Sequence, residues 1–63
     1  MNEKPVAKLI GEDGNIFNLV GIACKALRGA GLYDQEKELR SRIWDAASYD
    51  DALCMIMEYV EVE

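Results

Sequence analysis

The side chains of this chain that could do chemistry are two cysteines and two pairs of adjacent carboxylates. The chain has no histidine among its 63 residues. Acid–base and nucleophilic catalysis usually rely on a histidine, or on a nucleophile held by a base. A reactive thiol needs an electropositive, partly exposed setting, and the sequence suggests none for either cysteine. We therefore expect no catalytic residue and no enzyme activity. The residues considered are Cys24, Cys54, Glu12, Asp13, Asp50 and Asp51.

The segment from Glu12 to Asn15 faintly resembles a calcium-binding loop. The EF-hand pattern requires alternating acids before its glycine and a glutamate six residues beyond it, whereas position 20 is valine. A turn followed by a helix N-cap explains the segment better. With no histidine and no second pair of thiols, a zinc site is not expected either. We predict no metal site and no cofactor.

Both cysteines lie within apolar stretches that have helical spacing. We expect Cys24 and Cys54 to be buried, free thiols that pack as small hydrophobic residues, rather than to form a disulfide. The 63 residues form a single small domain, and a domain of this size buries too little surface to be more than marginally stable. Self-association would reinforce it.

Charge is unevenly distributed along the chain, which has a net charge of −5. All seven basic residues lie between Lys4 and Arg42, whereas the segment from Ile43 onward contains six acids and no basic residue. Nucleic-acid-binding proteins generally carry a basic face. The only basic cluster is interrupted by acids, so a solvated helix face explains it better than a binding surface for DNA does. The cluster consists of Lys25, Arg28, Lys37, Arg40 and Arg42.

Two features bear on location. The first five residues are polar and lack the apolar region of a signal peptide. The longest apolar stretch, Ala52 to Met57, is far shorter than the roughly 20 residues that span a bilayer. We expect a cytoplasmic protein that does not associate with membranes.

The sequence pattern also predicts the elements that must position these residues, and together they indicate an α+β fold that is mainly α. A short strand is expected at about 5–10, a turn at 11–14 and a long helix at about 15–30. Its broad apolar arc, which includes Phe17 and Cys24, indicates a central helix covered on more than one side. Gly21 costs about 0.8–1 kcal/mol relative to alanine inside a helix, a cost that close approach of another backbone would offset. Gly31 is expected to be the left-handed cap.

A second helix is expected at about 34–47, with Asp34 at its N-terminus. Its narrow apolar stripe runs through Leu39 and Ile43, and its charged side chains are expected to face water. Two i,i+4 ion pairs, Glu36 with Arg40 and Glu38 with Arg42, have the favourable order.

A third helix is expected at 49–59, where Ser48 and Asp51 approximate a capping box. The run from Ala52 to Met57 is apolar all round, so this helix is either sandwiched in the core or meets a partner. The alternation at about 59–62 suggests a terminal strand that could pair with residues 5–10.

Aromatic side chains are the remaining candidates for function. Trp44 lies about 100° away from the stripe of the second helix on a helical wheel. We favour core packing for Trp44, because small cores depend on aromatic residues, although Trp and Tyr are also enriched at binding hot spots. The candidate interaction residues are Trp44, Tyr49, Asp50, Asp51, Met55 and Glu58.

These segments resemble a family of small uncharacterised bacterial proteins, many encoded on phages and conjugative elements. The family pattern is Gly-x-Asp-Gly-Asn-x-Phe, a long helix with a glycine stop, and a late Asp-Tyr-Asp-x-Leu-Leu helix. The chain departs from the pattern at Ser48, which replaces Asp, and at Ala52, which replaces Leu. The resemblance implies a cytoplasmic protein beside mobile-element genes and no known activity. The matching residues are Gly11, Asp13, Gly14, Asn15, Phe17, Ala26, Leu27, Ala30, Gly31, Tyr49, Asp50 and Leu53.

Three functions are compatible with the sequence. The leading hypothesis is a non-enzymatic interaction or accessory module that binds another protein or itself. The first alternative is an acidic inhibitor, or decoy, of a nucleic-acid-binding protein, acting through Asp50, Asp51 and Glu58. The second alternative is a small DNA-binding regulator that uses Arg40 and Arg42.

Overall fold

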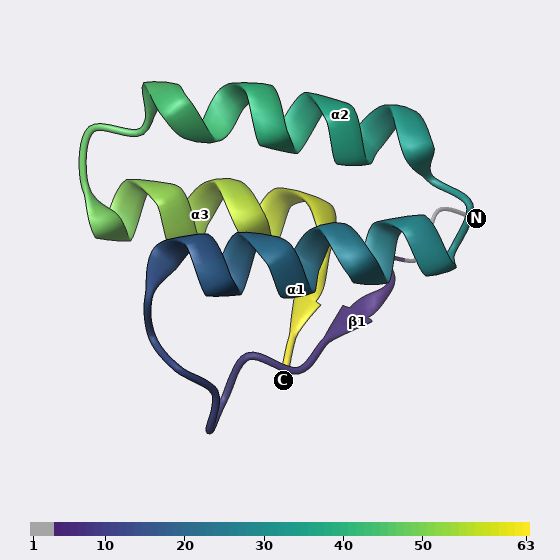
Figure 1. Ribbon diagram of the computed structural model, residues 1–63, viewed down its shortest axis with the longest axis horizontal. Coiled ribbons are helices and arrows are strands. Elements are labelled where there is room, and N and C mark those ends of the chain that lie inside the picture. The colour runs from purple at the N-terminus through teal and green to yellow at the C-terminus, as the bar shows by residue number, and fades with distance from the viewer. Residues whose placement is uncertain (1–3) are drawn as a thin grey trace.

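Within residues 4–63, which the computed structural model describes, three α-helices lie side by side and two short strands, from the first and last parts of this range, pair in a small sheet (Figure 1). The polar start of the chain at residues 1–3 lies outside the described residues. The arrangement confirms the predicted mainly α fold with a small β element. The elements are β1 (Val6–Ala7), α1 (Ile16–Gly29), α2 (Tyr33–Arg42), the 3-10 helix η1 (Ile43–Asp45), α3 (Tyr49–Tyr59) and β2 (Glu61–Val62).

The two strands pair in parallel, with Val6 opposite Glu61 and Ala7 opposite Val62. Parallel strands require a long crossover, which here is the whole helical region. Regular pairing is shorter than the predicted strands at 5–10 and 59–62. Backbone hydrogen bonds extend beyond the paired residues: the amide of Glu63 donates to the carbonyl oxygen of Ala7 at 3.0 Å, and the amides of Leu9 and Ile10 both donate to the carbonyl oxygen of Glu63, at 2.7 and 2.8 Å.

Helix α1 begins and ends where its capping residues predict. The side-chain oxygen of Asn15 accepts a hydrogen bond from the amide of Phe17 at 2.9 Å. At the other end, Gly31 has a φ of 76°, the left-handed conformation that glycine adopts at low cost. The amide of Leu32 donates to the carbonyl of Leu27 at 2.9 Å, and that of Gly31 to Arg28 at 3.0 Å, which together form a Schellman motif.

The core confirms α1 as the central helix, because it contacts α2, α3 and β1. The largest fully buried side chains come from four different segments of the chain. One expectation for α1 is wrong: Gly21 is exposed, and a Cβ placed there would meet no atom within 4 Å. Among residues 4–63, no other backbone approaches Gly21 to offset its helical cost. The largest buried side chains are Leu27, Leu39, Ile56, Val60 and Cys24.

Helix α2 is shorter than predicted, because it ends at Arg42 and continues as η1 rather than reaching residue 47. The chain must reverse here to enter α3, whose cap Ser48 has an extended backbone with φ −159° and ψ 171°. A tighter 3-10 turn commonly ends a helix in such places. At its start, Leu32 occupies the N-cap position and Asp34 lies in the first turn, so the predicted cap at Asp34 is wrong.

The charged face of α2 also departs from expectation. Glu36 is only 5% exposed, and its carboxylate accepts hydrogen bonds from Arg28 at 2.7 Å and from Arg40 at 3.3 Å. The pair with Arg40 was predicted, whereas the partner from α1 was not. Burial of Glu36 results from α1 packing against this side of α2.

The predicted pair between Glu38 and Arg42 is replaced by contacts with α3. Arg42 lies 3.0 Å from a carboxylate oxygen of Glu58 and donates to the hydroxyl of Tyr59 at 3.0 Å. The Tyr59 hydroxyl in turn donates to Glu38. The aromatic side chain therefore connects the two charges that were expected to pair directly.

Helix α3 has the predicted bounds. The hydroxyl of Ser48 accepts from the amide of Asp51 at 3.1 Å, and the Asp51 carboxylate accepts from the amide of Ala47 at 2.9 Å. In a standard capping box the acidic side chain accepts from the amide of the cap residue itself. Here Asp51 accepts instead from Ala47, the residue that precedes the cap Ser48. The apolar run of this helix is only partly covered, because Cys54 and Met57 are exposed. Burial of both cysteines was expected and is correct only for Cys24; both thiols are free.

Candidate functional site

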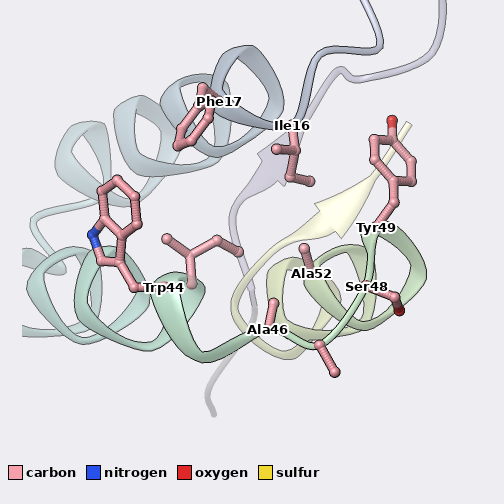
Figure 2. A pocket seen from close by; sticks show the side chains of 9 residues that line it. Ile16, Phe17, Trp44, Ala46, Ser48, Tyr49 and Ala52 are labelled. Atoms are coloured by element: carbon pink, nitrogen blue, oxygen red, sulfur yellow. The ribbon is translucent and has the colours of Figure 1, made fainter.

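A groove of about 280 Å³ lies where α1 begins and where the chain passes from α2 to α3 (Figure 2). Its walls come from the first turn of α1, from η1 and from the start of α3. Most of its lining side chains are apolar or aromatic. The lining residues are Ile16, Phe17, Ile43, Trp44, Ala46, Ala47, Ser48, Tyr49 and Ala52.

Two aromatic rings form one side of the groove. The ring centroids of Phe17 and Trp44 are 5.7 Å apart, and their planes are inclined by 48°. Tilted rings at this separation attract each other. The pair is nonetheless largely open to solvent, since Phe17 is 63% exposed and Trp44 is 75% exposed. Figure 2 shows both side chains together, away from Tyr49.

Tyr49 forms the opposite end of the groove. Its hydroxyl donates to the carbonyl oxygen of Gly14 at 2.5 Å, which fastens the turn before α1 to the start of α3. The ring itself is 47% exposed. The groove is therefore closed at this end by a contact between segments that lie far apart in the sequence.

Two polar groups of the groove lining are engaged in capping. The Ser48 hydroxyl accepts from the Asp51 amide, and the Asp51 carboxylate accepts from the amide of Ala47, which lines the groove. These bonds hold the wall between η1 and α3. What the groove offers to a ligand is mainly apolar and aromatic contact.

Several carboxylates belong to residues next to the groove lining in sequence, although none lines the groove itself. Asp13 accepts from the amide of Asn15 at 3.0 Å, beside Ile16, and Asp51 lies against Ala47. Asp45 and Asp50 directly follow Trp44 and Tyr49, and both are exposed. The segments that supply the walls, 11–24 and 43–63, contain no lysine or arginine.

The six predicted interaction residues are distributed over different surroundings. Trp44 and Tyr49 line the groove, and Asp50 is exposed next to Tyr49. Asp51 is used in capping. Two others lie elsewhere: Met55 packs half-buried against the core, and Glu58 pairs with Arg42, whose hydrogen bonds lower the pKa of the Glu58 carboxyl.

Core packing for Trp44 was favoured from the sequence and is wrong. The prediction relied on the dependence of small cores on aromatic residues, although the helical wheel placed Trp44 off the apolar stripe, and it assumed a continuous helix to residue 47. Because α2 ends at Arg42, Trp44 belongs to η1, where the backbone turns toward α3 and the side chain stays at the surface.

Phe17 was missed as a site residue because its spacing places it on the same face of α1 as Cys24, two turns further on. Cys24 is fully buried, and the charges of Arg40 and Glu36 on α2 act on its thiol. Phe17 lies at the start of α1, where Trp44 of η1 is its aromatic neighbour. The spacing of the two residues on α1 is the same, so their difference in burial comes from what packs against each end of the helix.

The turn that faintly resembles a calcium loop is held by its own hydrogen bonds. Asp13 and Asn15 each accept from a nearby backbone amide, and the Asn18 side chain donates to the carbonyl of Asp13 at 2.9 Å. These contacts confirm the turn and the N-cap. Among residues 4–63, no three His, Cys, Asp or Glu side chains are grouped so that they could hold a metal ion.

Comparison with protein-family models, with curated proteins and with solved structures finds no match to this chain. In the part of the chain that the structure describes, every helix is too short or too polar to cross a lipid bilayer. Functional inference therefore starts from the shape and charge of the groove.

Proposed function

We propose that this protein is a non-enzymatic interaction module that holds an apolar segment of a partner protein in its aromatic groove. One observation carries the proposal: Phe17, Trp44 and Tyr49 remain 47–75% exposed around a groove that is already formed. Trp and Tyr are the residues most enriched at binding hot spots. Exposed apolar surface gathered in one place is typical of interaction sites.

The groove is also preorganised. Its two sides are held by the ring contact between Phe17 and Trp44 and by the hydrogen bond from Tyr49 to Gly14. Because a fixed groove loses little conformational freedom on binding, more of the contact energy contributes to affinity.

The size of the groove is compatible with a side chain as its occupant. Its volume of about 280 Å³ is near the lower end of the roughly 300–1,000 Å³ that small-molecule and cofactor sites occupy. The space suits one or two apolar side chains of a bound segment.

The hydroxyl groups in the groove support a non-enzymatic role. The Ser48 hydroxyl serves as a helix cap, and the Tyr49 hydroxyl donates to a backbone carbonyl. Nucleophilic catalysis needs a hydroxyl activated by a base, and the chain contains no histidine that could act as one.

The ion pairs weigh against the two nucleic-acid hypotheses. Arg40 is paired with Glu36 and Arg42 with Glu58, so the arginines that a DNA-binding regulator would use are already engaged. Of the acids that a decoy would present, Asp51 caps α3 and Glu58 is bound to Arg42.

We further infer that the protein works in the cytoplasm. Its two thiols are free and Cys54 is exposed, which suits a reducing compartment. The resemblance of its turn and late-helix motifs to proteins of mobile elements supports an accessory role beside such genes.

A capture experiment with matched variants tests the proposal. The immobilised protein is exposed to a lysate of its native host, in parallel with Trp44→Ala, Phe17→Ser and the control Ile10→Ser. Ile10 is 79% exposed and does not line the groove, so this variant removes a comparable exposed apolar side chain elsewhere. Bound proteins are identified by mass spectrometry, purified and titrated against the protein directly.

We expect a partner that is retained by the wild type and by Ile10→Ser and lost with either groove variant. Because Trp44 is the only tryptophan, the direct titration should also change its fluorescence. Recovery of no specific protein, or equal recovery by Trp44→Ala, would contradict the proposal. Circular dichroism of each variant shows whether a loss of binding reflects a loss of folding.

A further inference from the structure

We infer that the segment held by the groove is cationic and amphipathic: an apolar side chain enters the groove, and flanking lysines or arginines meet the carboxylates around it. This inference rests on the proposed function and adds the chemical class of the partner. It is drawn from the charges on the two walls.

The lining itself is uncharged, but the chain segments that form both walls contain acids and no bases. Glu12 and Asp13 precede the α1 side of the groove, and Asp45, Asp50 and Asp51 are sequence neighbours of lining residues on the other side. The carboxylates of Asp13 and Asp51 are placed by hydrogen bonds to backbone amides at or beside the lining. A cationic segment would therefore meet negative charge from either side, which favours its encounter and its orientation.

The two arginines that precede the groove segment in sequence are paired with other groups. Arg42 precedes Ile43, but its guanidinium is held by Glu58 and Tyr59 on α3. Arg40 lies one turn before Trp44, and its guanidinium is directed to Glu36. These pairs leave the charge at the groove negative, although α2 itself contains three basic residues.

The aromatic rings add a second reason to expect a cation. Trp44 is 75% exposed, so part of its ring is open to a ligand. A guanidinium or ammonium group is attracted to the face of a tryptophan ring within about 6 Å of its centroid. A lysine or arginine next to the anchoring apolar residue could contact Trp44 and Asp45 together.

Three synthetic peptides test the partner's class. The first is an amphipathic peptide of leucine and lysine, the second has glutamate in place of each lysine, and the third has glutamine in place of each leucine. Each is titrated into the full-length protein while Trp44 fluorescence is recorded, and the amide shifts of Phe17, Trp44 and Tyr49 are followed by NMR.

The leucine–lysine peptide should saturate the fluorescence change and shift the groove amides. The other two peptides should bind at least about tenfold more weakly, the effect of one lost favourable contact of typical size. Raising the salt concentration should weaken the first peptide, because exposed charges are screened.

A matched pair of variants locates the charge effect. Asp45→Asn combined with Asp50→Asn should weaken the leucine–lysine peptide several-fold. Asp34→Asn combined with Glu61→Gln removes the same charge from exposed positions outside the groove, and it should have a much smaller effect. Equal weakening by the two double variants would overturn the inference.

Other outcomes separate this inference from the proposed function. Equal binding of the lysine and glutamate peptides would overturn the cationic partner and leave an apolar groove that binds proteins. The cationic partner would also be overturned if the captured protein requires Trp44 for binding but the leucine–lysine peptide does not bind. The proposed function would then still hold. If light scattering shows a dimer that Trp44→Ala abolishes, the occupant is a second copy and the inference is wrong.

Discussion

The two cysteines show how strongly the surroundings of a single residue decide its chemistry. Cys24 is fully buried on α1, and burial raises the pKa of its thiol, while Arg40 and Arg28 act in the opposite direction and Glu36 reinforces the rise. Cys54 lies on the outer side of α3 and is exposed. Since the thiolate is the reactive form, the two residues should differ in reactivity.

We predict that the native protein reacts with a thiol reagent such as iodoacetamide at Cys54 only. Cys54→Ser should remove the fast reaction, and Cys24 should react only after unfolding in urea. Mass spectrometry of the labelled protein checks both statements. Equal labelling rates for the two thiols in the native state would contradict the burial of Cys24 beneath the neighbouring helices.

Two glycines likewise have different roles because their backbone conformations and surroundings differ. Gly21 lies inside α1 with open space around it, whereas Gly31 holds the left-handed cap with φ 76°. Gly21→Ala should raise the free energy of unfolding by about 0.8–1 kcal/mol, the helix-propensity difference. Gly31→Ala should lower it by about 1–2 kcal/mol, the cost of the left-handed conformation for a residue with a Cβ.

Urea unfolding followed by circular dichroism measures both changes. The two substitutions are chemically identical, so opposite signs would isolate the backbone conformation as the cause. A loss of stability in Gly21→Ala would instead mean that another part of the molecule approaches this face of α1.

At the scale of the elements, two polar connections join the helices. Glu36 of α2 binds Arg28 of α1, and the hydrogen bond from that arginine is the main reason why the pKa of Glu36 is lowered. Tyr59 of α3 lies between Arg42 and Glu38 of α2; burial, followed by the hydrogen bond to Glu38, raises its pKa. Each polar connection joins two helices that also pack against each other through the apolar core.

The lowered pKa of Glu36 predicts the direction of the acid response. Because the folded-state pKa lies below the ordinary value of 4.5, the ion pairs contribute stability that is fully present above that pH. This stability is lost as the pH falls through the folded-state pKa. Glu58, whose pKa is lowered mainly by its hydrogen bonds with Arg42, adds to the same loss.

Thermal unfolding measured from neutral pH to about pH 2 checks this prediction. Glu36→Gln should lower the melting temperature at neutral pH and flatten its acid dependence. The control Asp34→Asn removes an exposed carboxylate from the same helix and should retain most of the acid dependence. If the melting temperature of Glu36→Gln falls with decreasing pH as steeply as that of the wild type, Glu36 does not contribute to the acid dependence of stability.

At the scale of the whole molecule, the first and last segments depend on each other. β1 and β2 pair with each other, and buried residues extend from Ala7 to Val60. The radius of gyration is 10.6 Å, which matches the roughly 10.6 Å expected for a folded chain of this length. The helices and the small sheet therefore share one core, and damage to it should affect every element.

Leu27→Ala tests this dependence. Leu27 is fully buried, and such a truncation costs about 2–5 kcal/mol. A core of this size rarely supplies more than about 3–5 kcal/mol. We expect circular dichroism to show a largely unfolded protein at 25 °C, whereas Met57→Ala, at a position 47% exposed, should stay folded. A folded, cooperative Leu27→Ala protein would show that stability has another main source.

Local signals in the sequence determined the elements that are governed by neighbouring residues. Asn15, Gly31 and Ser48 each act within a few residues of themselves. The start and end of α1, the bounds of α3 and the fold class were therefore predictable. The pairing of the terminal segments was also suggested, by the strand-like composition of residues 5–10 and the alternation at 59–62, although its parallel direction follows only from the completed fold.

The tertiary structure alone decided the end of α2, the burial of Glu36 and the groove. Each depends on contacts between residues that are distant in sequence: Arg28 lies against Glu36, Phe17 against Trp44, and Tyr49 against Gly14. Helical spacing describes one helix at a time and cannot say where its neighbour stops. Because α2 ends at Arg42, Phe17 and Trp44 stay at the surface, and the aromatic groove exists.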